Sequence, residues 1–179
     1  MAANSIVTPP SLARGSEVFV AAVPLTAAKG PPQLVMSAAY SLSLSWDLQH
    51  FMVLSSSPTL PSQVLVFDFQ PQDPENVYAA LAALSGRKIP GVLLTRKMKK
   101  LPNMRCWKVG SCNVDVEEVI HGFNSSWDTD LIVGQHDCRH YTNGLVECLT
   151  GEKDVLDRLR RSRTSIARAA FASGTFPMV

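Results

Sequence analysis

A cysteine at the start of a predicted helix is the residue best placed to do chemistry in this 179-residue chain. Cys138 follows Asp137, and the expected helix runs from there to about Leu149 and ends at Gly151. Free N–H groups and the dipole at a helix N-terminus favour the thiolate. The dipole supplies only about 0.3–1 kcal/mol, less than one pKa unit at about 1.36 kcal/mol per unit. A nucleophilic Cys138 therefore needs a nearby imidazolium.

Four histidines could supply that imidazolium, and His50 fits best. His140 lies two residues after Cys138 on the same predicted helix, where side chains at that spacing point to different faces. His136 is too close to Cys138 along the chain to meet its sulfur with good geometry. His121 falls on a predicted helix, where a surface or packing position is expected. His50 instead falls in a predicted strand. A strand-borne histidine that faces a helix N-terminus is an arrangement used by thiol enzymes.

Asp68 is the candidate third member of this site. It is the one ionisable residue in the apolar strand predicted at Gln63–Phe69, and His50 belongs to the strand predicted at Gln49–Leu54. An acid among apolar neighbours needs a polar partner, and His50 would be a fitting one. The candidate catalytic set is therefore Cys138 as nucleophile, His50 as base and Asp68 as the residue that orients His50.

Each of these residues also has a purely structural interpretation. Cys138 could be a buried, inert thiol, and His50 could be a core histidine bonded to a backbone carbonyl. Asp68 could cap a turn before Pro71. His140 is expected to be structural and to bond backbone from within its helix.

The chain offers weaker candidates for metal and redox chemistry. His136, Cys138 and His140 alternate in sequence, so on a strand they would line one face and could bind a metal. On a helix they cannot, and no fourth ligand is obvious, so we expect no metal and no cofactor. Cys106 and Cys112 are expected to be packed thiols or a surface pair, and a redox-sensing role remains the third alternative.

The strands and helices predicted around these residues indicate an α+β fold, with a small antiparallel sheet packed on helices. The segments 49–54 and 63–69 read as an antiparallel pair joined by a long loop. We expect a flexible arm at 1–15, one domain at 16–160 and a flexible basic tail at 161–179. The other predicted strands are 17–25, 92–94 and 105–109, and the other predicted helices are 75–84, 115–126 and 155–163.

Composition limits the partners. The chain is 46% hydrophobic and 18% charged with a net charge of +2, which argues against nucleic-acid binding. No apolar run reaches the roughly 18 residues of a membrane span. Four cysteines favour reduced thiols in the cytoplasm, although the acid-free segment 1–15 leaves a plastid or mitochondrial address open. The basic segments 96–100 and 158–168 are expected to be solvated, with contact to anionic lipid, phosphate or a membrane surface as the alternative.

The order histidine strand, polar strand and distant cysteine helix resembles the circularly permuted papain-like fold. That group includes the lecithin:retinol acyltransferase family, its phospholipase/acyltransferase relatives and the PPPDE thiol peptidases. Residues 137–141 (Asp-Cys-Arg-His-Tyr) are similar in layout to the lipid branch's Asn-Cys-Glu-His-Phe motif. Residues 49–51 match the first-strand histidine, and 66–71 resemble the second strand, with Asp68 where a second histidine is common. Residues 149–151 are similar to the end of the PPPDE cysteine helix.

The resemblance implies a cysteine-dependent hydrolase or acyltransferase that acts on an ester, amide or isopeptide carbonyl through an acyl-enzyme. The substrate would be an acyl lipid, a peptide or a protein. The alternative is a catalytically inactive papain-like fold that serves as a binding or scaffold module. Asp137 in place of Asn, and Asp68 in place of His, favour that alternative.

Overall fold

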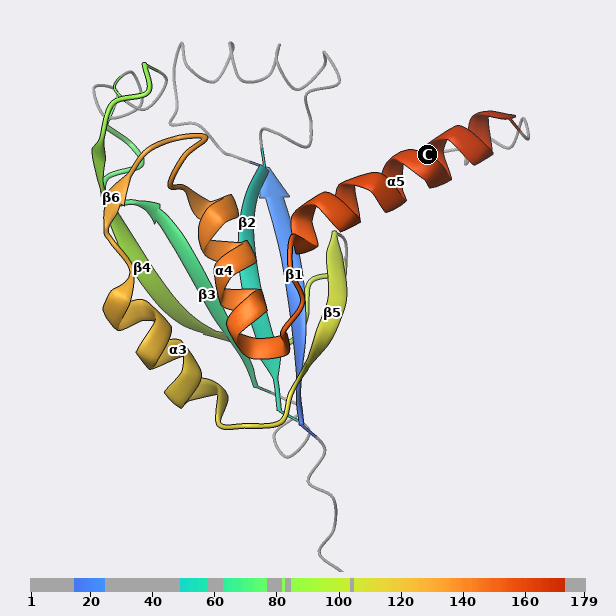
Figure 1. Cartoon of the computed structure of the whole chain (residues 1–179), viewed down its shortest axis with the longest axis horizontal. Coiled ribbons are helices and arrows are strands. Elements are labelled where there is room, and N and C mark those ends of the chain that lie inside the picture. The colour runs from blue at the N-terminus through green and yellow to red at the C-terminus, as the bar shows by residue number, and fades with distance from the viewer. Residues whose placement is uncertain are drawn as a thin grey trace, which may run out of the picture.

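The protein has an α+β fold in which helices lie against an antiparallel sheet (Figure 1). The computed structural model describes residues 15–24, 49–57, 63–76, 82, 85–103 and 105–172. Six strands within this part form one sheet in the order β5-β1-β2-β3-β4-β6. The strands are β1 (Ser16–Pro24), β2 (Gln49–Ser56), β3 (Val64–Pro71), β4 (Ile89–Met98), β5 (Cys106–Cys112) and β6 (Asp130–Leu131). The helices described are α3 (Val116–Ser126), α4 (Cys138–Thr150) and α5 (Val155–Ala172).

Strands β1, β2 and β3 are buried on both faces, because apolar residues occupy successive positions along them. One face packs against α4, and α3 lies beside α4. The main core lies between this face and the helices, and its largest members include Phe51, Phe67, Phe69, Tyr141 and Leu145. A smaller core on the opposite face consists of Ala21, Met52, Leu54, Val64 and Val66.

Strands β2 and β3 are paired over only half of their length. The ladder between β1 and β2 continues to Pro24 opposite Gln49, at the very start of β2. The ladder between β2 and β3 stops at Val53 opposite Phe67. Figure 1 shows these two strands diverging toward the end of the sheet where α4 begins. Beyond the last ladder pair, side chains rather than backbone hydrogen bonds must connect β2 to β3.

Helices α3 and α4 begin and end close to the residues that the sequence predicts. The Asp115 side chain accepts the N–H groups of Glu117 and Glu118 at the start of α3, as an N-cap does. Asp137 caps α4, and Gly151 closes it in the left-handed conformation with φ 76°. The predicted strand pair at 49–54 and 63–69 is also confirmed as antiparallel.

The predicted boundaries of β4 and α5 are wrong. The strand expected at 92–94 runs from Ile89 to Met98, so the basic run at 96–100, expected as a loop, begins inside the sheet. The helix expected at 155–163 continues to Ala172, so the tail assigned to 161–179 begins as helix. The residues added to the end of β4 include the cations Arg96 and Lys97, which interrupt the apolar pattern. The residues added to α5, 164–172, contain one cation and several alanines, which suit a helix.

Other expectations fall on residues outside the described part of the chain. These are nearly all of the arm at 1–15, the end of the tail at 173–179 and most of the helix expected at 75–84. Among the helices described, none has the length and apolar character that crossing a membrane requires.

Candidate functional site

His50 and Asp68 are brought together at the point where β2 and β3 separate. The His50 Nε2 atom lies 2.9 Å from Asp68 Oδ2. The Asp68 side chain is 0% exposed and that of His50 is 12% exposed. Their hydrogen bond therefore joins the two strands beyond the end of their backbone ladder. It also gives the buried carboxylate the polar partner that its apolar surroundings demand.

Cys138, the first residue of α4, lies close enough to His50 to affect the pKa of its ring. Burial lowers the pKa of His50, but hydrogen bonds to Asp68 and Cys138, together with the charges of both groups, raise it to about 9. Because Nε2 is engaged by Asp68, Nδ1 is the ring nitrogen available to the thiol. His50 thus interacts with both of the other predicted residues, which together form one connected group, and Cys138 is half-buried.

Arg96 joins this group, and the sequence analysis missed it. Its Nη2 atom donates to Asp68 Oδ2 at 2.8 Å, so one carboxylate oxygen accepts from both Arg96 and His50. Strand register explains the contact: Asp68 pairs with Leu94 and Val66 pairs with Arg96. Arg96 is therefore a diagonal neighbour of Asp68 on the same face, within reach of a long side chain. Extending the predicted strand through Met98 would have revealed it.

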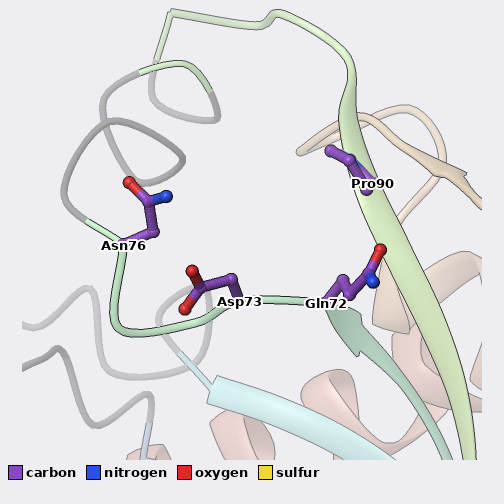
Figure 2. Close-up of a pocket in the computed structure, with 4 residues that line it drawn as sticks. All are labelled: Gln72, Asp73, Asn76 and Pro90. Carbon is purple, nitrogen blue, oxygen red and sulfur yellow. The ribbon is translucent and has the colours of Figure 1, made fainter.

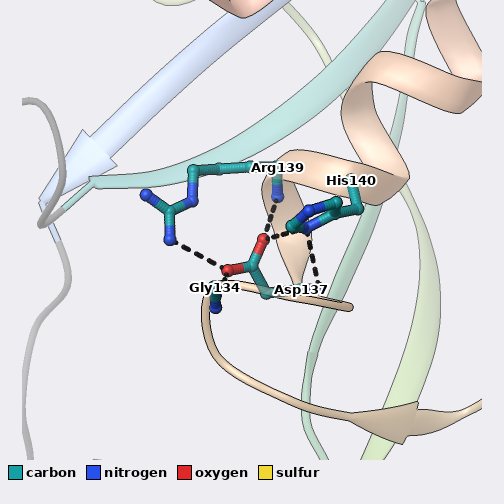
Figure 3. Close-up of polar contacts among 4 residues, drawn as sticks. All are labelled: Gly134, Asp137, Arg139 and His140. Carbon is teal, nitrogen blue, oxygen red and sulfur yellow. Dashed lines mark hydrogen bonds and ion pairs between the residues drawn. The ribbon is translucent and has the colours of Figure 1, made fainter.

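The charge of Asp137 is engaged in the turn that leads into α4 (Figure 3). One carboxylate oxygen accepts the Arg139 N–H at 2.9 Å and lies 3.0 Å from His140 Nδ1. The other accepts the Gly134 N–H at 2.7 Å and Arg139 Nη2 at 3.0 Å. Burial raises the pKa of Asp137, but these contacts with Arg139, Gly134 and His140 lower it to about 2. His140 Nδ1 also accepts the Asp137 backbone N–H at 3.4 Å, so His140 bonds backbone from within its helix, as expected.

His136 is held in an aromatic cluster. Its ring stacks on Trp127 with centroids 4.3 Å apart and planes 18° apart, and its Nε2 lies 2.8 Å from the Asp128 carbonyl oxygen. The alternating His136, Cys138 and His140 therefore do not share one face of a strand. Within the described ranges, no three His, Cys, Asp or Glu side chains are grouped so that they could hold a metal ion.

Buried polar atoms without a hydrogen-bond partner occur within the connected group and close to it in sequence. Gln49, next to His50 on β2, is 1% exposed, and both its amide oxygen and its amide nitrogen lack a partner. The Thr142 hydroxyl, one helical turn after Cys138, and Asp68 Oδ1 are also buried and unpartnered. Such atoms cost about 1–3 kcal/mol each unless water or a bound molecule meets them. The sequence signal was a polar residue at the start of an apolar strand, and it was overlooked.

The other cysteines lie outside this site. Cys106 and Cys112 occupy the two ends of β5, about 20 Å apart at the usual strand rise. A disulfide needs Cα atoms within about 7 Å, so these two residues cannot pair while β5 is intact. Burial raises the pKa of Cys106, and burial and the Glu147 charge raise that of the exposed Cys148.

An open depression follows β3, with a volume of about 360 Å³. Figure 2 shows its lining side chains, which are Gln72, Asp73, Asn76 and Pro90. Gln72 lies four residues beyond Asp68 along the chain, a span of about 13 Å in a strand. With one carboxylate and neither histidine nor cysteine in its lining, this depression does not supply the chemistry of the Cys138 group.

Comparisons of this chain with known protein families, with curated proteins and with solved structures gave no match.

Proposed function

We propose that this protein is a cysteine-dependent hydrolase or acyltransferase of the circularly permuted papain type. It acts on an ester, amide or isopeptide carbonyl, and its substrate is an acyl lipid, a peptide or a protein. The observation that carries the proposal is the position of His50, whose ring contacts both Asp68 and Cys138. Free thiols are the rule in the cytoplasm, and all four cysteines are free here, so we assign the activity to the cytoplasm, with the plastid as the alternative.

The mechanism follows from the order of these contacts. The Cys138 proton passes to His50, and the thiolate attacks the carbonyl carbon. The imidazolium then protonates the leaving alcohol or amine, which leaves a thioester on Cys138. Water or an acceptor alcohol or amine loses its proton to His50, attacks the thioester and releases the thiol. Asp68 holds the Nε2–H of the ring throughout.

The start of α4 supplies the remaining element of the mechanism. Cys138 is the first residue of the helix, so its backbone N–H has no partner within the helix. An N–H in that position is suited to hold the negative oxygen that forms on the attacked carbonyl. The antiparallel sheet, with histidine on β2, acid on β3 and cysteine opening α4, agrees with the element order of the proposed family.

A catalytically inactive module is the second candidate function. In the lipid branch of the proposed family an Asn stands before the cysteine, whereas here Asp137 is engaged by Arg139, Gly134 and His140. The depression after β3 is also separate from Cys138. A protein of this kind would keep the connected group only as a structural contact.

Thiol alkylation distinguishes the two candidates. We expect iodoacetamide to modify Cys138 at pH 6.5 at least about tenfold faster than Cys148, because an imidazolium partner favours the thiolate. Cys148 lies on the same helix, and its pKa is raised by burial and by Glu147, so it is an internal reference in each digest. With the pKa of His50 at about 9, the Cys138 advantage should persist through neutral pH. His50→Ala should abolish it, and His121→Ala, an exposed histidine on α3, should not.

An acyl-transfer assay completes the test. p-Nitrophenyl acetate should give a burst of p-nitrophenol and an acetyl adduct on Cys138, both lost in Cys138→Ser. Equal alkylation of Cys138 and Cys148, unchanged in His50→Ala and without a burst, would support the inactive module and overturn the enzyme.

A further inference from the structure

We propose that Arg96 is a positioning residue of this site, which keeps the buried Asp68 carboxylate directed at His50. This inference rests on the proposed function, because its effect is read through the reactivity of Cys138. The observation behind it is that Asp68 Oδ2 accepts hydrogen bonds from both cations, at 2.8 Å from Arg96 and 2.9 Å from His50.

The burial of Asp68 makes the second cation important. Its side chain is 0% exposed, and its other oxygen, Oδ1, is buried without a partner. A buried carboxylate is disfavoured unless cations or N–H groups compensate for the lost water. Here the compensation comes through one oxygen from His50 and Arg96. Removing Arg96 leaves the imidazolium as the single cation in hydrogen-bonding contact with that acid.

The half-exposed position of Arg96 does not make this an ordinary surface ion pair. Ion pairs with both partners in solvent contribute little to stability. Arg96 is 52% exposed, but the acid it binds is fully buried. Breaking one side of a pair around a buried charge is costly, because the charge that remains has lost its compensation. The half-exposed Arg96 guanidinium therefore compensates the charge of a carboxylate that is fully buried.

Among the groups around Asp68, Arg96 is the one whose positive charge does not change with pH. From β2 comes His50, which titrates, and from β4 comes Arg96, which stays charged. From α4 come Cys138, which contacts His50, and Tyr141. Burial raises the pKa of Tyr141, so it stays neutral, and its hydroxyl donates to Asn124 at 2.9 Å. Arg96 is thus the fixed end of the series Arg96, Asp68, His50 and Cys138.

The test is the pH profile of Cys138 alkylation in Arg96 variants. In Arg96→Met we expect the rate at pH 6.5, relative to Cys148, to fall about three- to tenfold and the profile to move to higher pH, because an Asp68 side chain without its Arg96 contact no longer holds the His50 imidazolium in place. Arg96→Lys, which keeps a cation, should recover most of the rate. Arg96→Gln, which keeps donors without charge, should not. Lys97→Met, the next residue on the same strand, is the matched control and should behave as wild type.

The outcomes separate this inference from the proposed function. A wild-type profile in both Arg96→Met and Arg96→Gln, with Cys138 still disabled in His50→Ala, would overturn the role of Arg96 and leave the enzyme proposal standing. An ordinary thiol profile in wild type and in His50→Ala would overturn the proposed function and this inference with it. If Arg96→Met does not fold, Arg96→Gln and Arg96→Lys alone decide, because they differ in charge while both retain N–H donors.

Discussion

Three residues at the candidate site carry buried polar atoms without partners. Gln49 precedes His50, Thr142 lies one turn after Cys138, and Asp68 leaves Oδ1 unpaired. Most buried polar atoms in folded proteins are hydrogen-bonded, so this grouping reduces stability at one place. Atoms of these types can accept or donate to a carbonyl compound. These atoms are therefore candidates for contact with buried water or with a bound polar molecule.

Replacing Gln49 should stabilise the protein. Gln49→Met removes two desolvated, unpartnered groups while keeping the side-chain length, and we expect a gain of about 1 kcal/mol in the free energy of unfolding. That corresponds to a rise of roughly 2–4 °C in Tm for a chain of this size. Thermal unfolding followed by circular dichroism measures it, with Gln72→Met, an exposed glutamine, as the control. A lower Tm for Gln49→Met would show that its amide is hydrogen-bonded in solution.

Residue-level chemistry was partly readable from the sequence. An acid within the apolar run of β3 needs a partner, and that reasoning led to the His50 contact that the structure contains. Arg96 was missed because a run of cations after an apolar segment is typical of a loop, and strand ends are the least predictable boundaries. Gln49 was missed because a glutamine at a strand start is ordinary unless its burial is known.

At the scale of elements, the turn into α4 sets where the thiol lies. Asp137 binds the Gly134 and Arg139 N–H groups and the Arg139 side chain, and so fixes the chain on both sides of Cys138. The helix itself was predictable, because its N-cap and Gly151 mark both ends. The ion pair with Arg139 was not, since it depends on the path of the chain before the helix.

Replacing Asp137 should weaken α4 in a pH-dependent way. Asp137→Asn keeps a capping oxygen but loses the charge, and we expect a cost of about 1 kcal/mol at pH 7; Asp137→Ala should cost about 1–2 kcal/mol. The pKa of Asp137 is lowered from 3.8 to about 2. Its charge therefore stabilises the fold fully above about pH 4, and this contribution is lost as the pH falls toward 2.

Urea unfolding at pH 7, 4 and 3 measures this effect. The gap between wild type and Asp137→Asn should narrow as the pH falls from 4 to 3. Asp115→Asn is the matched control, because that N-cap accepts only backbone N–H groups. A gap that stays constant from pH 7 to 3 would contradict a role for the Asp137 charge.

At the scale of the whole molecule, long-range pairing determines the site, and local sequence does not encode it. Strand β5 pairs with β1, about 90 residues away in the chain, and β4 pairs with β3 on the other side of the sheet. Close packing supports this order. A Cβ at Gly110 on β5 would lie 2.8 Å from the Thr150 side chain, so the glycine allows the end of α4 to approach the sheet. The α+β class was predictable from element types, whereas strand order and the approach of α4 were not.

Only the first turns of α5 are expected to contribute to the stability of the domain. Val155 and Leu156 are buried and Leu159 packs against the main core, while Arg160, Arg161 and Ser162 are exposed. Figure 1 shows α5 projecting away from the sheet beyond its first turns. A chain that ends after Ser162 should therefore keep its Tm within about 2 °C, since burial of apolar area is the main source of stability.

A chain that ends after Lys153 should behave differently. It loses the two buried side chains of Val155 and Leu156, each worth about 1.5–3 kcal/mol, so we expect a clear fall in Tm. In the chain that ends after Ser162, Cys138 alkylation at pH 6.5 should be unchanged, because the described contacts of the site all lie before α5. Thermal unfolding and alkylation of the two truncated chains measure both effects. Loss of stability or of Cys138 reactivity on removing 163–179 alone would instead make that basic segment part of the functional domain.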